Sequence, residues 1–213
     1  MGAQPDPDQL IGLTLTEFAD ALGSEQTAPG GGSASALAGA LGGALAEMVA
    51  RLTLGRAKYA AYQDEMAAVQ DRGDLLKTRL LALVDADTTA YNRIVEAYKL
   101  PKETDAQKVQ RTAAVQSALR VATEVPLTIA EACAEVLDLT VQVAEHGNRT
   151  AASDAAVGAL LAHAGLLGAA HNVRINLRSL KDDAFCTHAR SRVAGLLEAG
   201  ESALARALAA ADA

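Results

Sequence analysis

Hydrophobic residues recur every three or four positions along most of the chain, and this spacing predicts α-helices rather than strands. Glycine, proline and asparagine divide the pattern, and we expect helices over residues 13–22, 34–54, 61–99, 105–124, 127–145, 149–180 and 182–211. Asp105 is expected to cap its helix, and Pro126 to break or bend the chain because proline lacks a backbone N–H. The pattern predicts an all-α fold, a mainly antiparallel bundle of long helices in one domain that covers residues 1–213.

Two hydrophobic rows run along segment 34–54, and we expect both to be buried. One row consists of large side chains, namely Leu37, Leu41, Leu45, Met48 and Leu52. The other consists of small residues that let a neighbouring helix approach closely, namely Gly39, Gly43, Ala46 and Ala50. Helices this long and this rich in alanine often bury one face against a second subunit, so we expect a homodimer.

Composition and charge narrow the possible functions. The net charge is -7 and the chain has no basic block, so we expect no nucleic-acid partner. The uncharged stretch 27–46 contains Pro29 and several glycines, and charged residues follow on its helix, so we expect no membrane partner. Residues 1–12 carry Asp6 and Asp8 but no basic residue, which predicts a flexible arm rather than a secretory signal.

The thiols and imidazoles show no spacing typical of metal ligands. Cys133 and Cys186 lie far apart, and the four histidines form no His-x-x-x-His or His-x-Glu pattern. We therefore expect no metal, two free thiols and a cytoplasmic location.

A glycine-rich stretch, Thr27-Ala-Pro-Gly-Gly-Gly-Ser33, precedes segment 34–54. We expect a tight loop that ends at Ser33 as the N-cap, which leaves a helix N-terminus free to receive a polar or anionic group. The stretch lacks the Gly-Lys-Ser/Thr of a phosphate-binding loop, and no strand pattern precedes it. The residues alone leave two interpretations open, a ligand cradle or a plain connector.

Asp87 is a polar residue within a hydrophobic row of segment 61–99. It lies in line with Leu80, Leu83 and Tyr91, so its side chain should face the interior. Burial would raise its pKa and suit it to acid–base chemistry. Alternatively, Asp87 pairs with an arginine or caps a neighbouring helix. We expect Asp85 to be solvated.

Segment 149–180 carries a glycine-lined stripe that includes Asp154, Asn172 and Asn176, all within about 40° of one another around a helix. Asp154 and Asn172 are separated by roughly 27 Å along a straight helix, so they cannot contact the same small group. Asn172 and Asn176 lie one turn apart. They could hydrogen-bond one flat heterocycle, or they could bridge helices through hydrogen bonds in the core.

Seven short segments occur in a recognisable order across nearly the whole chain. They are Pro29-Gly-Gly-Gly-Ser33, Met48 to Tyr59, Asp87-Thr-Thr-Ala-Tyr91, Leu100-Pro-Lys-Glu-Thr104, Glu124-Val-Pro-Leu127, Gly147-Asn148 with Ser153-Asp154, and Asn172-Val-Arg-Ile-Asn176. Taken together, they resemble the cyclodeaminase/cyclohydrolase family of tetrahydrofolate enzymes. The resemblance implies an all-helical, dimeric enzyme that acts on a folate one-carbon compound without a metal or any cofactor beyond the folate substrate.

The resemblance also implies roles for particular residues. Asp87 would stabilise the cationic substrate and take a proton from water, and Lys58 would be a second proton carrier or would grip the glutamate tail. The substrate-binding residues would be Pro29, Gly30, Gly31, Gly32, Ser33, Tyr59, Tyr91, Asn148, Asp154, Asn172 and Asn176. We favour hydrolysis of 5,10-methenyltetrahydrofolate to 10-formyltetrahydrofolate. The alternatives are a formiminotetrahydrofolate cyclodeaminase, which releases ammonia, and a non-catalytic folate-binding or scaffold dimer.

Overall fold

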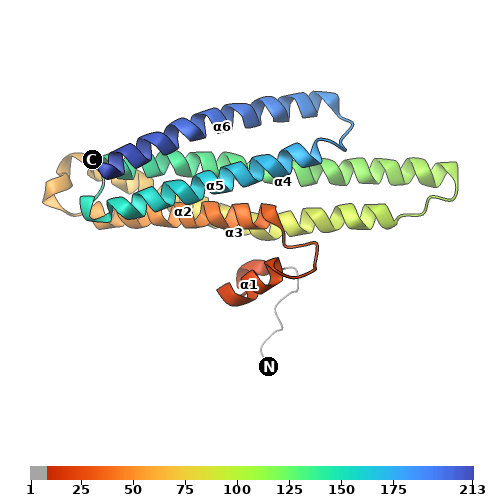
Figure 1. The fold of residues 1–213 in the computed structure, drawn as a ribbon, viewed down its shortest axis with the longest axis horizontal. Helices are drawn as coiled ribbons and strands as arrows, with labels where there is room; N and C mark the ends of the chain where they lie inside the picture. Colours follow the sequence, from red (N-terminus) through yellow and green to blue (C-terminus); the bar gives the residue numbers. More distant parts are fainter. Residues whose placement is uncertain (1–8) are drawn as a thin grey trace.

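The computed structural model describes residues 9–213, and every regular element in that range is helical, which confirms the predicted all-α class. The α-helices are α1 (Leu15–Leu22), α2 (Gly31–Thr53), α3 (Gln63–Lys99), α4 (Asp105–His146), α5 (Ala152–Asn176) and α6 (Asp183–Asp212). Short 3-10 helices cover Leu10–Gly12 (η1), Ala57–Tyr62 (η2) and Arg149–Ala151 (η3). Figure 1 shows that consecutive long helices run in opposite directions along one axis.

The long helices form a bundle around α4. This helix packs against α2, α3, α5 and α6, while α2 also packs closely against α3 and α5. Helix α6 lies along α4 and α5, and α1 stands to one side of the bundle (Figure 1). The interior is filled by hydrophobic side chains of the long helices, and fully buried examples are Met66, Leu76, Leu80, Ile129, Leu137 and Leu166.

Helix α4 runs through Pro126 without a break, so the two helices predicted on either side of this proline are one helix of 42 residues. Pro126 cannot donate to the carbonyl of Ala122, four residues earlier. That carbonyl instead accepts a hydrogen bond of 2.6 Å from Nδ2 of Asn176 on α5. A side chain from another helix thus replaces the missing donor, which is why the prediction was wrong.

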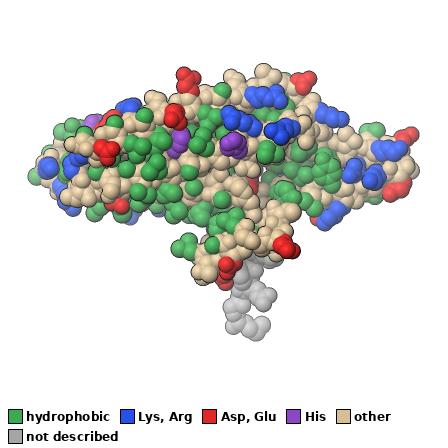
Figure 2. All heavy atoms as spheres, viewed as in Figure 1, with side chains coloured by type: hydrophobic (Ala, Val, Ile, Leu, Met, Phe, Trp, Pro, Cys, Tyr) green, Lys and Arg blue, Asp and Glu red, His purple; other side chains and the backbone are tan. Residues whose placement is uncertain are grey.

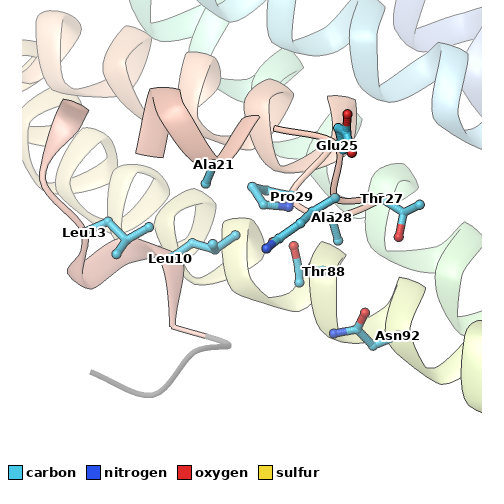
Figure 3. A pocket seen from close by; sticks show the side chains of 10 residues that line it. Leu10, Leu13, Ala21, Glu25, Thr27, Ala28, Pro29, Thr88 and Asn92 are labelled. Carbon is cyan, nitrogen blue, oxygen red and sulfur yellow. The ribbon is translucent and has the colours of Figure 1, made fainter. Parts of the chain in front are cut away.

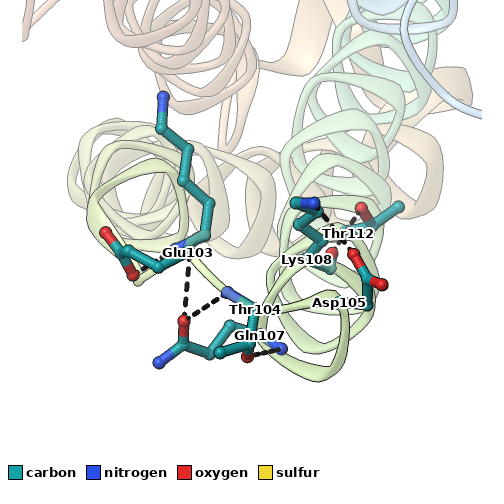
Figure 4. Close-up of polar contacts among 7 residues, drawn as sticks. Glu103, Thr104, Asp105, Gln107, Lys108 and Thr112 are labelled. Carbon is teal, nitrogen blue, oxygen red and sulfur yellow. Dashed lines mark hydrogen bonds and ion pairs between the residues drawn. The ribbon is translucent and has the colours of Figure 1, made fainter.

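The start of α4 is capped by Thr104, not by the predicted Asp105 (Figure 4). The Thr104 hydroxyl accepts from the Gln107 amide at 3.2 Å, and the Gln107 side chain accepts from the Thr104 amide at 3.0 Å. This reciprocal pair satisfies two backbone N–H groups. Asp105 lies in the first turn, where it forms an ion pair with Lys108.

Of the two rows on α2, only the row of small residues is buried as predicted. Leu41, Met48 and Leu52 of the large row are 47%, 36% and 40% exposed. The small row faces the neighbouring helices because they approach too closely for side chains. A Cβ on Gly39 of this row would lie 2.4 Å from the Cys133 sulfur. A Cβ on Gly42, a buried glycine outside the row, would lie 2.8 Å from the Gly158 carbonyl oxygen.

The arm predicted over residues 1–12 is ordered from residue 9 onward, and residues 1–8 lie outside the described part of the chain. Leu10 is buried in the core, and its amide donates to Asp85 Oδ1 at 2.7 Å. The amide of Ile11 donates to the same oxygen at 3.2 Å. Asp85 is therefore half-buried and holds η1 on the bundle, contrary to the expected solvated carboxylate.

Two helical stretches, α2 and Arg149–Asn176, are long and apolar enough to cross a membrane by length and composition. Core helices of soluble proteins pass the same test, and 61% of the tested window of α2 is buried within the bundle. The buried Glu47 of α2 pairs with Lys77 of α3 at 2.7 Å, which is a contact between helices of the bundle. These stretches therefore give little support for a membrane span.

Candidate active site

A cavity of about 250 Å³ lies where the first turn of α2 meets α3 and α5, and we call it the Asp87 pocket. Many of the residues predicted to form the site line it together. These are Gly30, Gly31, Gly32, Asp87, Tyr91, Asn172 and Asn176. The remaining lining residues were not predicted, and they are Thr27, Ala28, Thr88, Ile94, Ala122 and Ile175.

Asp87 projects from α3 toward the start of α2 and caps that helix. Its Oδ2 atom accepts from the Ser33 amide at 3.0 Å and from the Ser33 hydroxyl at 3.4 Å. The capping role left open for Asp87 is thus observed. The predicted N-cap is wrong, because Gly30 is the N-cap and Ser33 lies inside the first turn of α2. Asp87 supplies the side-chain cap that glycine lacks.

The carboxyl group of Asp87 is half-buried at the wall of the pocket. Removal from water raises its pKa above the ordinary aspartate value, while the two hydrogen bonds from Ser33 act in the opposite direction. Within residues 9–213, the Oδ1 atom has no hydrogen-bond partner. Asp87 therefore offers one oxygen to the pocket that can accept a proton or stabilise a cation.

Gly32 permits the close approach of Asp87 to α2. A Cβ atom at this position would lie 2.2 Å from Asp87 Oδ1, which no real contact allows. The corresponding atom on Gly31 would lie 3.5 Å from Asn172 Nδ2, an ordinary contact distance. The need for a glycine in this motif is thus sharpest at Gly32, where the absence of a side chain makes room for the carboxylate.

The side-chain amides of Asn172 and Asn176 each donate one hydrogen bond to a backbone carbonyl of a helix. Asn172 Nδ2 donates to Gly168 at 2.9 Å, and Asn176 Nδ2 donates to Ala122 at 2.6 Å. The interhelical bond expected as an alternative is therefore observed for Asn176. Both residues also line the pocket, so their amide oxygens remain available to a ligand.

Four of the predicted residues lie at the opposite end of α2. Tyr59 and Asn148 are buried, and the Arg149 amide donates to the Tyr59 hydroxyl at 3.1 Å. Lys58 is exposed and lies over the Tyr59 ring, and Asp154 is in the first turn of α5. Since α2 has 23 residues, this group is roughly 33 Å from the Asp87 pocket. One chain does not bring the two groups together.

Asn148, which belongs to this second group, has a structural role. Its side-chain amide donates to the Leu52 carbonyl at 3.2 Å, and its oxygen accepts from the Thr150 amide at 3.2 Å. Its own backbone amide donates to the Thr53 hydroxyl at 2.8 Å. Both polar atoms of the side chain thus take part in linking the end of α2 to the start of α5.

Three further observations concern the surroundings of the Asp87 pocket and possible metal ligands. Pro29, predicted to bind substrate, lines a neighbouring cavity rather than the Asp87 pocket. Thr88 was missed in sequence reasoning although it follows Asp87 directly, and its hydroxyl lies 3.3 Å from that of Ser33. The part of the chain that the structure describes contains no group of three or more His, Cys, Asp or Glu side chains that could hold a metal ion.

The chain is similar to proteins described as cyclodeaminases and cyclohydrolases. The family model described as formiminotransferase-cyclodeaminase matches residues 14–195. The methenyltetrahydrofolate cyclohydrolase of Methylorubrum extorquens is 43% identical over 88% of this chain and 90% of its own length. The formimidoyltransferase-cyclodeaminase of Rattus norvegicus is 36% identical over 95% of this chain, which spans 38% of that protein. The crystal structure of the formiminotetrahydrofolate cyclodeaminase of Thermotoga maritima has a TM-score of 0.85 at 28% identity, covering 94% of this chain and 96% of that one.

Proposed function

Because this chain belongs to the formiminotransferase-cyclodeaminase family, we propose that it hydrolyses 5,10-methenyltetrahydrofolate to 10-formyltetrahydrofolate. The observation that carries the proposal is the carboxylate of Asp87, which is half-buried in a pocket and keeps one oxygen free. The cyclohydrolase relative supports this choice among folate reactions, since its alignment covers nearly the whole of both proteins.

The proposed reaction needs one group that handles a proton next to a cation. The amidinium carbon of the substrate is bonded to N5 and N10, and a water molecule attacks it. Asp87 accepts a proton from that water, and its negative charge favours the cation and the developing adduct. The adduct hydroxyl then loses its proton to solvent as the C–N5 bond breaks and the formyl carbonyl forms. N5 takes the proton held by Asp87, and the formyl group stays on N10.

The substrate itself supplies the electrophile, so we propose that the reaction uses no metal and no cofactor beyond the folate. We also propose a cytoplasmic location. Both cysteines, Cys133 and Cys186, are buried and free, which suits a reducing compartment.

A cyclodeaminase reaction is the second candidate, and the similarity to the Thermotoga maritima cyclodeaminase favours it. In that reaction N10 attacks the formimino carbon of 5-formiminotetrahydrofolate, and ammonia leaves. Asp87 would again carry the proton, so the same pocket serves either reaction. A non-catalytic folate-binding or scaffold protein is the remaining alternative.

Purified protein supplied separately with each folate compound distinguishes these functions by the absorbance of the methenyl group. Loss of methenyl absorbance faster than in buffer is the result expected for the cyclohydrolase. Appearance of that absorbance from the formimino compound would replace our proposal with the cyclodeaminase. Absence of both changes would leave only the non-catalytic alternative.

We further propose that the chain acts as a homodimer joined through α2 and α5. The outer side of α2 presents Leu41, Met48 and Leu52 to solvent, and the adjacent side of α5 presents Val157, Leu160 and Leu167. Figure 2 shows hydrophobic side chains gathered over these helices. An apolar face of this length is typical of a subunit interface.

A two-fold axis across the middle of α2 would set the two copies of this helix antiparallel. The end of α2 near Lys58 in one subunit would then lie beside the Asp87 pocket of the other. Such a dimer unites the two groups of predicted residues that a single chain keeps roughly 33 Å apart. Lys58 would thus serve the pocket of the partner.

Mixed dimers test this arrangement. Asp87→Asn and Lys58→Met proteins are each expected to be nearly inactive, and mixing them by unfolding and refolding produces hybrids. In each hybrid one of two sites has both residues intact, so about a quarter of wild-type activity should return. No recovery, with hybrids shown by mass spectrometry, would contradict a shared site. Sedimentation of a fully active monomer would contradict the dimer.

A further inference from the structure

The Asp87 pocket is too small for a whole folate. Its volume of about 250 Å³ is below the usual range of roughly 300–1,000 Å³ for small-molecule sites. A tetrahydrofolate derivative consists of a reduced pterin, an aminobenzoyl ring and a glutamyl group in a row. If the proposed function holds, a large part of the substrate must lie outside this pocket.

A second cavity of about 600 Å³ adjoins the first, and we call it the arm cavity. The two cavities share Thr27, Ala28 and Thr88 as lining residues, so they meet beside Asp87. Figure 3 shows Ala28 and Thr88 at this junction, with Leu10 and Leu13 on the far side of the cavity. The arm cavity is therefore the nearest space into which a bound substrate can extend.

The arm cavity exists because α1 is held away from the bundle. Asp85 fixes η1 at one end through the Leu10 and Ile11 amides, and Gly30 begins α2 at the other. Between these points only Phe18 of α1 is buried. The segment formed by η1 and α1 thus leaves a space between itself and α3 that its side chains do not fill.

The two cavities offer different chemistry. The Asp87 pocket carries the amide oxygens of Asn172 and Asn176, which suit the N–H donors of a pterin. The arm cavity is walled by Leu10, Leu13 and Ala21, which suit an aromatic ring.

Polar groups in the arm cavity complete the fit. The half-buried carboxamide of Asn92 has no hydrogen-bond partner among residues 9–213, so it is free to bind an amide of the ligand. Glu25 also lines the cavity, but its carboxylate points away from Thr88 and Asn92 in Figure 3. Gln26, Thr27 and Thr88 also line the cavity, so the aryl end of a ligand meets an apolar wall flanked by side-chain amides and hydroxyls.

We propose that the arm cavity binds the aminobenzoyl-glutamyl half of the substrate, while the Asp87 pocket binds the pterin half. The proposal rests on the function proposed above. The reacting carbon bridges N5 of the pterin and N10 of the aminobenzoyl group, so it belongs where the two cavities meet. Asp87 lines the pocket on the pterin side of that junction, and it directly precedes Thr88, which lines both cavities.

Two alanines on α1 give a matched pair for the test. Ala21 lines the arm cavity, whereas Ala19 is exposed on another side of the same helix. Ala21→Phe should fill the cavity, and Ala19→Phe adds the same ring to the surface. Binding of p-aminobenzoyl-glutamate and of 6-hydroxymethylpterin is measured by calorimetry, which requires no turnover. Asn92→Leu is a second variant that leaves α1 untouched.

Ala21→Phe should weaken p-aminobenzoyl-glutamate binding by about 10- to 100-fold, as expected when a buried ring loses its site, and Ala19→Phe should not. Asn92→Leu should weaken it less. Pterin binding should be unchanged in all three variants. If Ala21→Phe lost pterin binding instead, the pterin half would occupy the arm cavity, and the proposed orientation would be wrong. If Ala21→Phe bound both probes as tightly as wild type, the arm cavity would not be a binding site.

The same variants separate this proposal from the proposed reaction. Selective loss of p-aminobenzoyl-glutamate binding in a protein that converts neither folate compound would support the arm cavity and overturn the reaction. Normal turnover with an unchanged KM in Ala21→Phe would support the reaction and overturn the arm cavity.

Discussion

At the first turn of α2, Asp87 keeps one carboxylate oxygen without a partner among residues 9–213. Beyond the last turn of α2, both polar atoms of the Asn148 side chain form hydrogen bonds within the chain. Both residues lie beside α2, and both were predicted to belong to the active site, Asp87 as a catalytic residue and Asn148 as a substrate-binding residue. The two side chains differ in whether a polar atom is left without a hydrogen-bond partner. An unsatisfied oxygen in a cavity is available for chemistry, whereas a fully bonded buried amide joins helices.

This contrast predicts that substitutions at the two ends fail in different ways. At the Asp87 end, catalytic rate should fall while the fold persists. At the Asn148 end, stability should fall first. Turnover and unfolding must therefore both be measured for each variant to distinguish loss of catalysis from loss of stability.

Asp87→Asn should have the largest effect. Loss of the proton acceptor should reduce turnover by roughly 10²- to 10⁴-fold, measured from methenyl absorbance. Asparagine can still accept from the Ser33 amide, so the cap on α2 should remain. Unchanged turnover would end the catalytic role of Asp87.

The pH dependence of Asp87 sharpens the same test. Its pKa is raised by burial, so the folded state holds this proton more tightly than the unfolded state does. Its ionisation therefore lowers stability as pH rises through the folded pKa, and Asp87→Asn should be as stable as wild type or more so at neutral pH. Wild-type turnover should fall as pH drops through that raised pKa.

Gly32→Ala should follow, because the new Cβ would occupy the space of Asp87 Oδ1. Displacing the carboxylate by about 1 Å should reduce turnover by roughly 100-fold. Gly31→Ala is the matched control, since its Cβ would make an ordinary contact with Asn172. Equal turnover in the two variants would show that the position of the carboxylate is not critical.

Asn148→Ala should mainly affect stability. It removes the donor to Leu52 and the acceptor for Thr150, which should lower the free energy of unfolding by about 2–3 kcal/mol. Denaturant unfolding measures this loss, and Thr150→Val should show a smaller one. A loss of turnover as large as that of Asp87→Asn in folded protein would abolish the distinction between the two ends.

Asn176→Ala tests a residue that belongs to the pocket and also to the framework. It leaves the Ala122 carbonyl without a donor, which should lower the free energy of unfolding by about 1–2 kcal/mol. In a Pro126→Ala background the new backbone N–H can bond that carbonyl, so the loss should shrink. Additive losses in the double variant would show that Asn176 does not replace the missing donor.

The helices themselves were predictable because hydrophobic spacing is a local property. The continuity of α4 was not, since the partner of the Ala122 carbonyl is 54 residues away in the sequence. The buried face of α2 was misjudged in part for a related reason. Both of its rows are apolar, and the close approach of Cys133 to Gly39 shows that the small row is the inner one.

The candidate site was predictable where a polar residue interrupts an apolar row. Asp87 was identified in this way, but its bond to Ser33 depends on how two helices meet. The same reasoning could not place Lys58 and Asn148, because a motif gives order along the chain and not distance in space. Their separation from Asp87 becomes visible only along the length of α2.

Two glycines of α2 are expected to be invariant among related sequences because of packing alone. At Gly39 and Gly42 a neighbouring atom occupies the space that a side chain would need. Substitutions there should be rejected during evolution as firmly as substitutions of Asp87. A ranking of positions by invariance would therefore place these glycines beside the carboxylate, although they have no side chain with which to act on a substrate.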